Sequence, residues 1–202
     1  MNFSPDTYQN AEPTQPEELR RKIMRASWLS GALWLLSGSL LIAFFQPGAW
    51  SELLAGHRSW ELQLLAGLTG GAAAGSLARI MMRLSAFRNI SREYSIIQLI
   101  RQADLRRRDI VSISFSAGIT EEWLFRAALQ PVLGLWLSSL IFVGLHGYFK
   151  FKNPAQIFFG AFMMTLSLFL GLLFMHAGLI AAMLAHAVYD IIVTSSMRKP
   201  DE

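Results

Sequence analysis

The most constraining feature of this sequence is a series of long stretches that are almost free of charge. Residues 26–45, for example, contain no charged side chain. A helix that crosses the hydrocarbon core of a bilayer needs about 20 largely apolar residues. The whole chain is 53% hydrophobic and only 16% charged, whereas soluble domains average about 25% charged residues. The sequence therefore predicts an all-α, polytopic membrane helix bundle.

About six stretches have the length and composition of a membrane span. They are residues 26–45, 62–82, 110–129, 132–148, 154–175 and 177–196. The second stretch contains Gly70, Gly71, Ala74 and Gly75. Small residues about four apart let another helix approach closely, so we expect tight helix packing along this span.

Basic residues mark the segments between the spans. Residues 91–105 alternate apolar with charged side chains, which is typical of an amphipathic helix on the membrane surface; a solvated connector is the alternative. Nearly all of the 18 Lys and Arg residues fall before the first span, in even-numbered loops or after the last span. Cytoplasmic loops carry such an excess. We therefore expect an integral multi-pass protein, in the cell (inner) membrane, with both termini cytosolic.

Several ionisable residues lie within the apolar C-terminal half. They are Glu121, Glu122, Arg126, His146, His186 and Asp190, with His176 near a predicted turn. A charge at the centre of a spanning helix costs about 2.5–3.5 kcal/mol on insertion scales. These side chains are therefore expected to pair with one another or to line a water-filled cavity.

Helical spacing indicates how these residues can pair. Glu122 and Arg126 are four residues apart and share a helix face, so they can form an ion pair. Glu121 is turned by about 100° from Glu122 and faces other neighbours. His186 and Asp190 also lie four residues apart, so Asp190 can orient the imidazole or share a cavity with it. A purely structural ion pair is the alternative for Glu122 and Arg126.

The residue types that are present limit the catalytic mechanisms that are possible. The chain has no cysteine, which excludes a thiol nucleophile. It also lacks the G-x-S-G, G-x-G-D and H-E-x-x-H patterns, which weakens intramembrane serine, aspartyl and zinc protease activities. Carboxylates and imidazoles remain, which suit a general base and oxyanion donors. No nucleic-acid-binding signature is present, and the apolar stretches make the lipid bilayer the expected partner.

Three short motifs resemble those of a known family. Residues 121–126 match E-E-x-x-x-R, residues 142–146 match F-x-x-x-H, and residues 186–190 match H-x-x-x-N/D. In this order, on three apolar helices, they are similar to the motifs of the CPBP family, the CAAX-processing and bacteriocin-related intramembrane proteases. The resemblance covers roughly residues 110–196. It implies a glutamate-dependent endopeptidase that hydrolyses a peptide bond in a membrane-associated substrate.

The resemblance also implies a role for each matched residue. Glu121 would activate water, while Glu122 and Arg126 would hold the helix and tune that base. His146 and His186 would position water or stabilise the oxyanion. Asp190 stands where many relatives have Asn, and an ionised Asp cannot donate to an oxyanion. No cofactor is expected; zinc is the alternative, with Glu121, His146 and His186 as its ligands.

The depth of His146 is inconsistent with this grouping. At about 1.5 Å per helical residue, Glu121 and His186 lie about 18 Å from the cytosolic boundary, whereas His146 lies only about 6 Å from Lys150. A tilted fourth span, a helix that continues beyond Lys150, or a cavity open to the cytosol would reconcile these depths.

The chain is expected to have four parts. They are a disordered cytosolic tail (1–19), two spans with a basic amphipathic connector (20–109), a catalytic four-helix membrane core (110–197) and a short cytosolic tail (198–202). Two other functions stay open at this point. One is a non-catalytic scaffold that binds a partner membrane protein, and the other is a small proton-coupled transporter.

Overall fold

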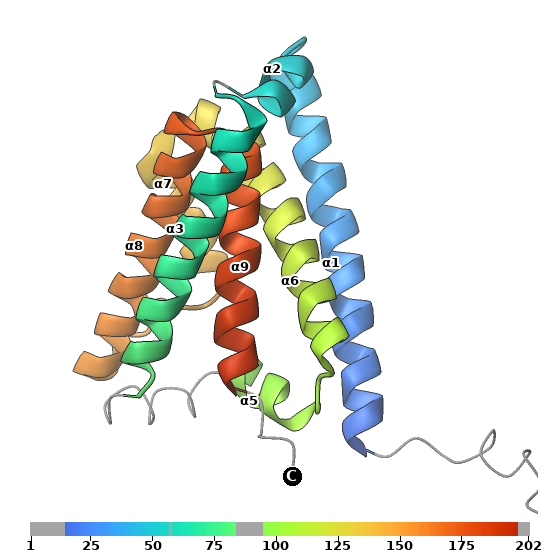
Figure 1. Ribbon diagram of the computed structural model, residues 1–202, viewed down its shortest axis with the longest axis vertical. Coiled ribbons are helices and arrows are strands. Elements are labelled where there is room, and N and C mark those ends of the chain that lie inside the picture. Colours follow the sequence, from blue (N-terminus) through green and yellow to red (C-terminus); the bar gives the residue numbers. More distant parts are fainter. Residues whose placement is uncertain (1–14, 57, 84–94, 198–202) are drawn as a thin grey trace, which may run out of the picture.

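The computed structural model describes residues 15–56, 58–83 and 95–197, and over these residues it is helical without strands. Figure 1 shows long helices packed side by side. In chain order the elements are α1 (Gln15–Phe45), α2 (Trp50–Ala55), α3 (Trp60–Met81), α5 (Ser95–Gln102), α6 (Arg107–Glu122), the π-helix η2 (Trp123–Leu129), α7 (Gln130–Leu145), α8 (Pro154–His176) and α9 (Leu179–Met197). The predicted helical membrane bundle is confirmed.

The described residues contain five helical segments long and apolar enough to cross a membrane, compared with about six predicted. They are Gln15–Phe45, Trp60–Met81, Arg107–Leu145, Pro154–His176 and Leu179–Met197. The third and fourth predicted spans share the segment Arg107–Leu145, which folds back at Gly134, where φ is 78° and ψ is 167°. Residues 135–145, after the reversal, reach only about 16 Å, too short to cross a hydrocarbon core of about 30 Å.

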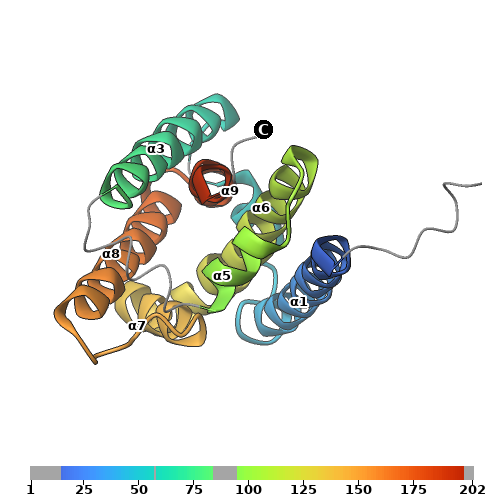
Figure 2. The ribbon, with the colours of Figure 1, turned by 90° about the horizontal axis from the view of Figure 1, so that it is seen from below.

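The segments outside the spans agree in part with the sequence. Helix α1 begins at Gln15, so residues 15–19 are helical although they were predicted to belong to a disordered tail. The rest of both predicted tails, and the first part of the predicted amphipathic helix, lie outside the described residues. The second part forms α5, which crosses one end of the bundle in Figure 2. Its Ile97 is buried while Arg101 is exposed, as an amphipathic helix requires.

Helix α9 lies between α3 and α6, and glycines bring it close to both (Figure 2). A Cβ atom on Gly71 of α3 would lie 2.5 Å from the Ala185 carbonyl oxygen. On the other side, a Cβ on Gly118 of α6 would lie 2.6 Å from the Met183 carbonyl oxygen. The close packing predicted for Gly71 and Gly75 is therefore observed against α9, whereas Gly70 faces Phe169 of α8.

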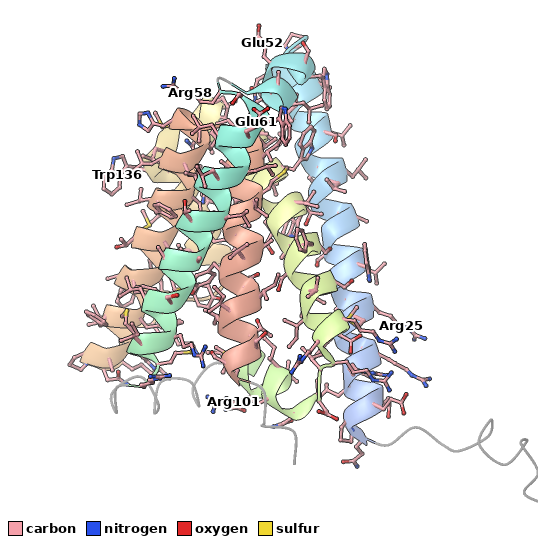
Figure 3. All side chains as sticks on the ribbon, in the orientation of Figure 1. Arg25, Glu52, Arg58, Glu61, Arg101 and Trp136 are labelled. Carbon is pink, nitrogen blue, oxygen red and sulfur yellow. The ribbon has the colours of Figure 1, made fainter. Side chains whose placement is uncertain are left out.

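Charged side chains gather at the two ends of the bundle. Figure 3 shows Arg25 and Arg101 at one end, and Glu52, Arg58 and Glu61 at the other. Between these ends the outer surface carries large exposed apolar side chains such as Leu29 and Phe44, 72% and 84% exposed. Such a surface is matched to lipid, and the chain is an integral membrane protein. The identity of the membrane and the cytosolic location of both termini stay predictions.

Candidate active site

All six residues singled out in the sequence meet in one cluster. Glu121 and Glu122 end α6, Arg126 lies in η2, His146 follows α7, and His186 and Asp190 lie on α9. Each member is within 4 Å of another member. The fold-back at Gly134 makes this possible, because it places Ser139 of α7 against Arg126 and Phe142 against Phe125.

Glu122 and Arg126 form a fully buried ion pair at the centre of the cluster. Both side chains are 0% exposed, and Arg126 Nε donates to Glu122 Oε2 over 2.9 Å. The other two Arg126 nitrogens donate to Ser139 of α7 at 3.3 Å and to Ser167 of α8 at 2.9 Å. A buried charge needs such partners to remain ionised. The predicted ion pair is therefore present, and it also ties three helical segments together.

Glu122 also holds His186. Its Oε1 lies 2.8 Å from His186 Nδ1. The sequence offered Asp190 as the residue that could orient this ring, but Asp190 Oδ2 lies 3.6 Å from the opposite nitrogen, Nε2. Glu122 therefore bridges Arg126 and His186, and this link between α6 and α9 was not foreseen. Spacing along one helix could not show it, because the two residues lie 64 positions apart.

Both histidines present the same nitrogen to Glu121. His146 Nδ1 lies 2.7 Å from the Phe142 carbonyl oxygen, which can only accept, so Nδ1 carries the hydrogen. His186 Nδ1 likewise donates to the Glu122 carboxylate. The two Nε2 atoms are thus the free positions of the rings, at 3.3 Å and 3.9 Å from Glu121 Oε2.

Exposure to a cavity distinguishes Glu121 from Glu122. The cavity has a volume of about 640 Å³, and Glu121, His146, His186 and Asp190 line it. Glu122 does not line it. The opposite wall is apolar and comes from α8, and Lys22 of α1 and Met197 of α9 also line the space. The α8 residues are Phe159, Phe162, Met163, Leu166 and Leu170. A largely apolar cavity with a few convergent polar groups is the usual form of a ligand site.

The π-helix η2 begins immediately after Glu122. Its wider turn carries Trp123, Leu124, Phe125 and Arg126 in a run of buried side chains. Phe125 packs edge-on against Phe142 at 4.9 Å between ring centroids, and Phe142 in turn lies 4.3 Å from the His146 ring. Short π-helical turns inside α-helices occur frequently at functional sites. No pattern in the sequence indicated this one.

The structure explains the depth of His146. Helix α7 ends at Leu145, so it neither continues beyond Lys150 nor reaches it. Residues 146–153 are not helical and connect the end of α7 to Pro154 at the start of α8. His146 can therefore lie at the level of Glu121 although only four residues separate it from Lys150. The cavity also extends from this level to Lys22 and Met197, and its opening to the cytosol stays a prediction.

Cofactor use stays a prediction. Within the described ranges, no group of three or more His, Asp or Glu side chains has an arrangement that could hold a metal ion. The alternative zinc ligands, Glu121, His146 and His186, converge through Glu121 Oε2 and the two Nε2 atoms.

Comparison with known proteins finds a family whose members resemble the part of the chain that carries this cluster. Residues 107–192 match the family described as "Type II CAAX prenyl endopeptidase Rce1-like", a range that includes all six site residues. The chain is also 33% identical over 90 residues to the "Uncharacterized protein YpbD" of Bacillus subtilis (strain 168). That alignment covers 44% of this chain and 46% of YpbD, so it spans about half of each. No solved structure matches. The resemblance drawn from the three motifs is confirmed: residues 107–192 match the family described as type II CAAX prenyl endopeptidase Rce1-like.

Proposed function

We propose that this protein is an intramembrane endopeptidase in which Glu121 activates water to hydrolyse a peptide bond. The observation that carries the proposal is the position of Glu121 Oε2. It lies close to two imidazole Nε2 atoms, at 3.3 Å and 3.9 Å, on the wall of a largely apolar cavity. A water molecule held by these groups could be deprotonated by the carboxylate as it attacks a peptide carbonyl.

The proton and charge balance follows from these positions. Glu121 takes one proton from water, and the hydroxyl oxygen bonds to the carbonyl carbon to form a tetrahedral oxyanion. A histidine protonated on both nitrogens can donate Nε2–H to that oxyanion. When the C–N bond breaks, Glu121 returns its proton to the leaving amine. The carboxylate is then regenerated, and no metal is required.

The remaining residues have supporting roles in this proposal. Glu122 fixes the His186 ring through Nδ1 and is itself held by Arg126. Asp190 faces His186 Nε2 from the cavity wall at 3.6 Å. The substrate class we propose is a membrane-associated protein or peptide that reaches the cavity from the bilayer.

A non-catalytic scaffold is the competing function. Burial of the Glu122–Arg126 pair suits a structural role equally well. A scaffold has no need, however, to orient two histidines toward Glu121, a carboxylate that lines the cavity. The two proposals differ most clearly at Glu121, because its substitution affects only the catalytic one.

The test compares membrane peptides from cells that produce the wild-type protein or Glu121→Gln. Glutamine keeps the shape but cannot accept the proton from water, so we expect uncleaved substrate to accumulate. His176→Ala is the matched control, because His176 is exposed at the end of α8 and does not line the cavity. Wild-type cleavage by Glu121→Gln, with an unchanged melting temperature, would refute the proposal.

A further inference from the structure

The end of α1 contacts the π-helix beside the proposed catalytic cluster. Gln46, the residue after α1, donates through Nε2 to the carbonyl oxygens of Ala127 and Ala128 at 3.1 Å and 3.0 Å. Its own backbone N–H continues the helix by donating to the Ile42 carbonyl oxygen at 2.8 Å. The Gln46 side chain is therefore attached to a well-defined helix end and reaches η2 across the helix interface.

The sequence after η2 explains why the Ala127 carbonyl can accept a hydrogen bond from outside its own helix. The π-helix ends at Leu129, and Pro131 follows at the start of α7. Proline has no backbone N–H, so the carbonyl of Ala127, four residues earlier, lacks its usual α-helical donor. A change from π to α bonding also disturbs the pairing around the junction. In an apolar surrounding a backbone carbonyl must find its donors within the protein, and Gln46 Nε2 donates to Ala127 there.

Three further contacts fix α1 against η2. A Cβ on Gly38 would lie 2.7 Å from the Trp123 ring, so only glycine allows this approach. Trp123 Nε1 also donates to Ser39 Oγ at 3.2 Å. One turn earlier on α1, Trp34 packs edge-on against Phe125 at 6.2 Å between centroids. Helix α1 thus contacts the beginning, the middle and the end of η2.

A short path leads from these contacts to the proposed catalytic groups. Ala127 follows Arg126, whose guanidinium holds Glu122, and Glu122 holds His186. A displacement of the η2 backbone at Ala127 would therefore move the Arg126 anchor and, through Glu122, the His186 ring.

We propose that Gln46 is a positioning residue for the cluster. By donating to Ala127 and Ala128 it holds the π-helical turn in place, and thereby keeps His186 Nε2 directed at Glu121. The expected effect of Gln46 on cleavage rests on the proposed endopeptidase function. The proposal concerns a segment outside the matched residues 107–192. In this chain, the N-terminal span would thus complete a site whose reacting groups all lie elsewhere.

The test uses the full-length protein in detergent micelles with ¹⁵N-labelled histidine. The probe is the His186 Nδ1–H signal, identified by its absence in His186→Gln. Gln46→Met keeps the length of the side chain but removes the donor, and Gln46→Lys supplies a donor again. Gln63→Met is the matched control, because Gln63 Nε2 also donates to two carbonyl oxygens, those of Ala55 and Arg58 at 3.0 Å each, which lie outside η2.

We expect Gln46→Met to shift the His186 signal and to lower cleavage of membrane peptides about ten-fold or more, since small misplacements of catalytic groups have effects of this size. Gln46→Lys should restore both readouts, and Gln63→Met should change neither. A wild-type signal and rate in Gln46→Met, or the same change in Gln63→Met, would overturn the proposal. If Glu121→Gln proves active, the endopeptidase proposal fails, but the His186 signal still decides the role of Gln46.

Discussion

His186 Nδ1 and Glu122 Oε1 lie 2.8 Å apart and join the α9 helix to the end of α6. The same carboxylate accepts from Arg126 through its other oxygen. One buried side chain thus sets the orientation of a histidine and neutralises an arginine. The second glutamate of the E-E-x-x-x-R motif differs in this way from the first, which contacts the cavity.

Substitution of Glu122 should therefore destabilise the protein, unlike substitution of Glu121. Glu122→Ala leaves the buried guanidinium of Arg126 without its carboxylate, and removal of one partner from a buried pair costs about 3–5 kcal/mol. Thermal unfolding in detergent should show a much lower melting temperature for Glu122→Ala than for Glu121→Ala. Equal melting temperatures for the two variants would contradict the assigned division of roles.

The serine partners of Arg126 should contribute measurably to stability. Ser167 Oγ accepts from Arg126 Nη2 at 2.9 Å, and hydrogen bonds to charged groups contribute about 1.5–3 kcal/mol. We expect Ser167→Ala to lower the free energy of unfolding by about that amount. Ser138→Ala serves as the control, because Ser138 is equally buried and donates to the local Leu135 carbonyl oxygen at 3.1 Å. A larger loss in the control would exclude a special role for Ser167.

Asp190 should tolerate replacement by asparagine. The two side chains have the same shape, and the resembled motif H-x-x-x-N/D has either residue at this position. Asp190 Oδ2 lies 3.6 Å from His186 Nε2, too far for a strong direct hydrogen bond. Asp190→Asn should keep most of the cleavage measured with wild type. Complete loss in this variant, with the fold intact, would show that the carboxylate itself takes part in the reaction.

Packing between α3 and α9 should control the site from a distance. A side chain at Gly71 would collide with the α9 backbone at Ala185, next to His186. Gly71→Val should therefore lower both stability and cleavage, because α9 is also packed against Gly118 of α6 and cannot yield without a change in the position of His186 relative to Glu121. Ala73→Val, on an exposed position of the same helix, provides the control. Circular dichroism melts and peptide analysis of the membranes check both effects, and equal behaviour of the two variants would refute the explanation.

Metal dependence can be measured directly. The proposed mechanism needs only Glu121 and the two histidines, so protein treated with a chelator and freed of zinc should retain its cleavage rate. Elemental analysis of the active sample should then find far less than one zinc per chain. Loss of activity that returns only with zinc would instead favour Glu121, His146 and His186 as metal ligands.

The sequence predicted the parts of the site that depend on one helix. The Glu122–Arg126 pair follows from a spacing of four residues, and the long apolar stretches predict the bundle. The bridge from Glu122 to His186 and the serine partners of Arg126 could not be predicted, because they join residues far apart in the chain. The π-helix and the reversal at Gly134 were also missed. A glycine and a proline in an apolar run fit several backbone paths, and tertiary packing selects among them.

The reversal at Gly134 has a consequence for the depth of the site in the bilayer. The returning half-helix after Gly134 reaches only about 16 Å, roughly half of the hydrocarbon thickness. Such a half-helix matches about one leaflet, so it carries the chain from one surface to about the middle of the bilayer, where His146 follows it. It thereby brings His146 to the depth of Glu121 without a complete crossing of the bilayer.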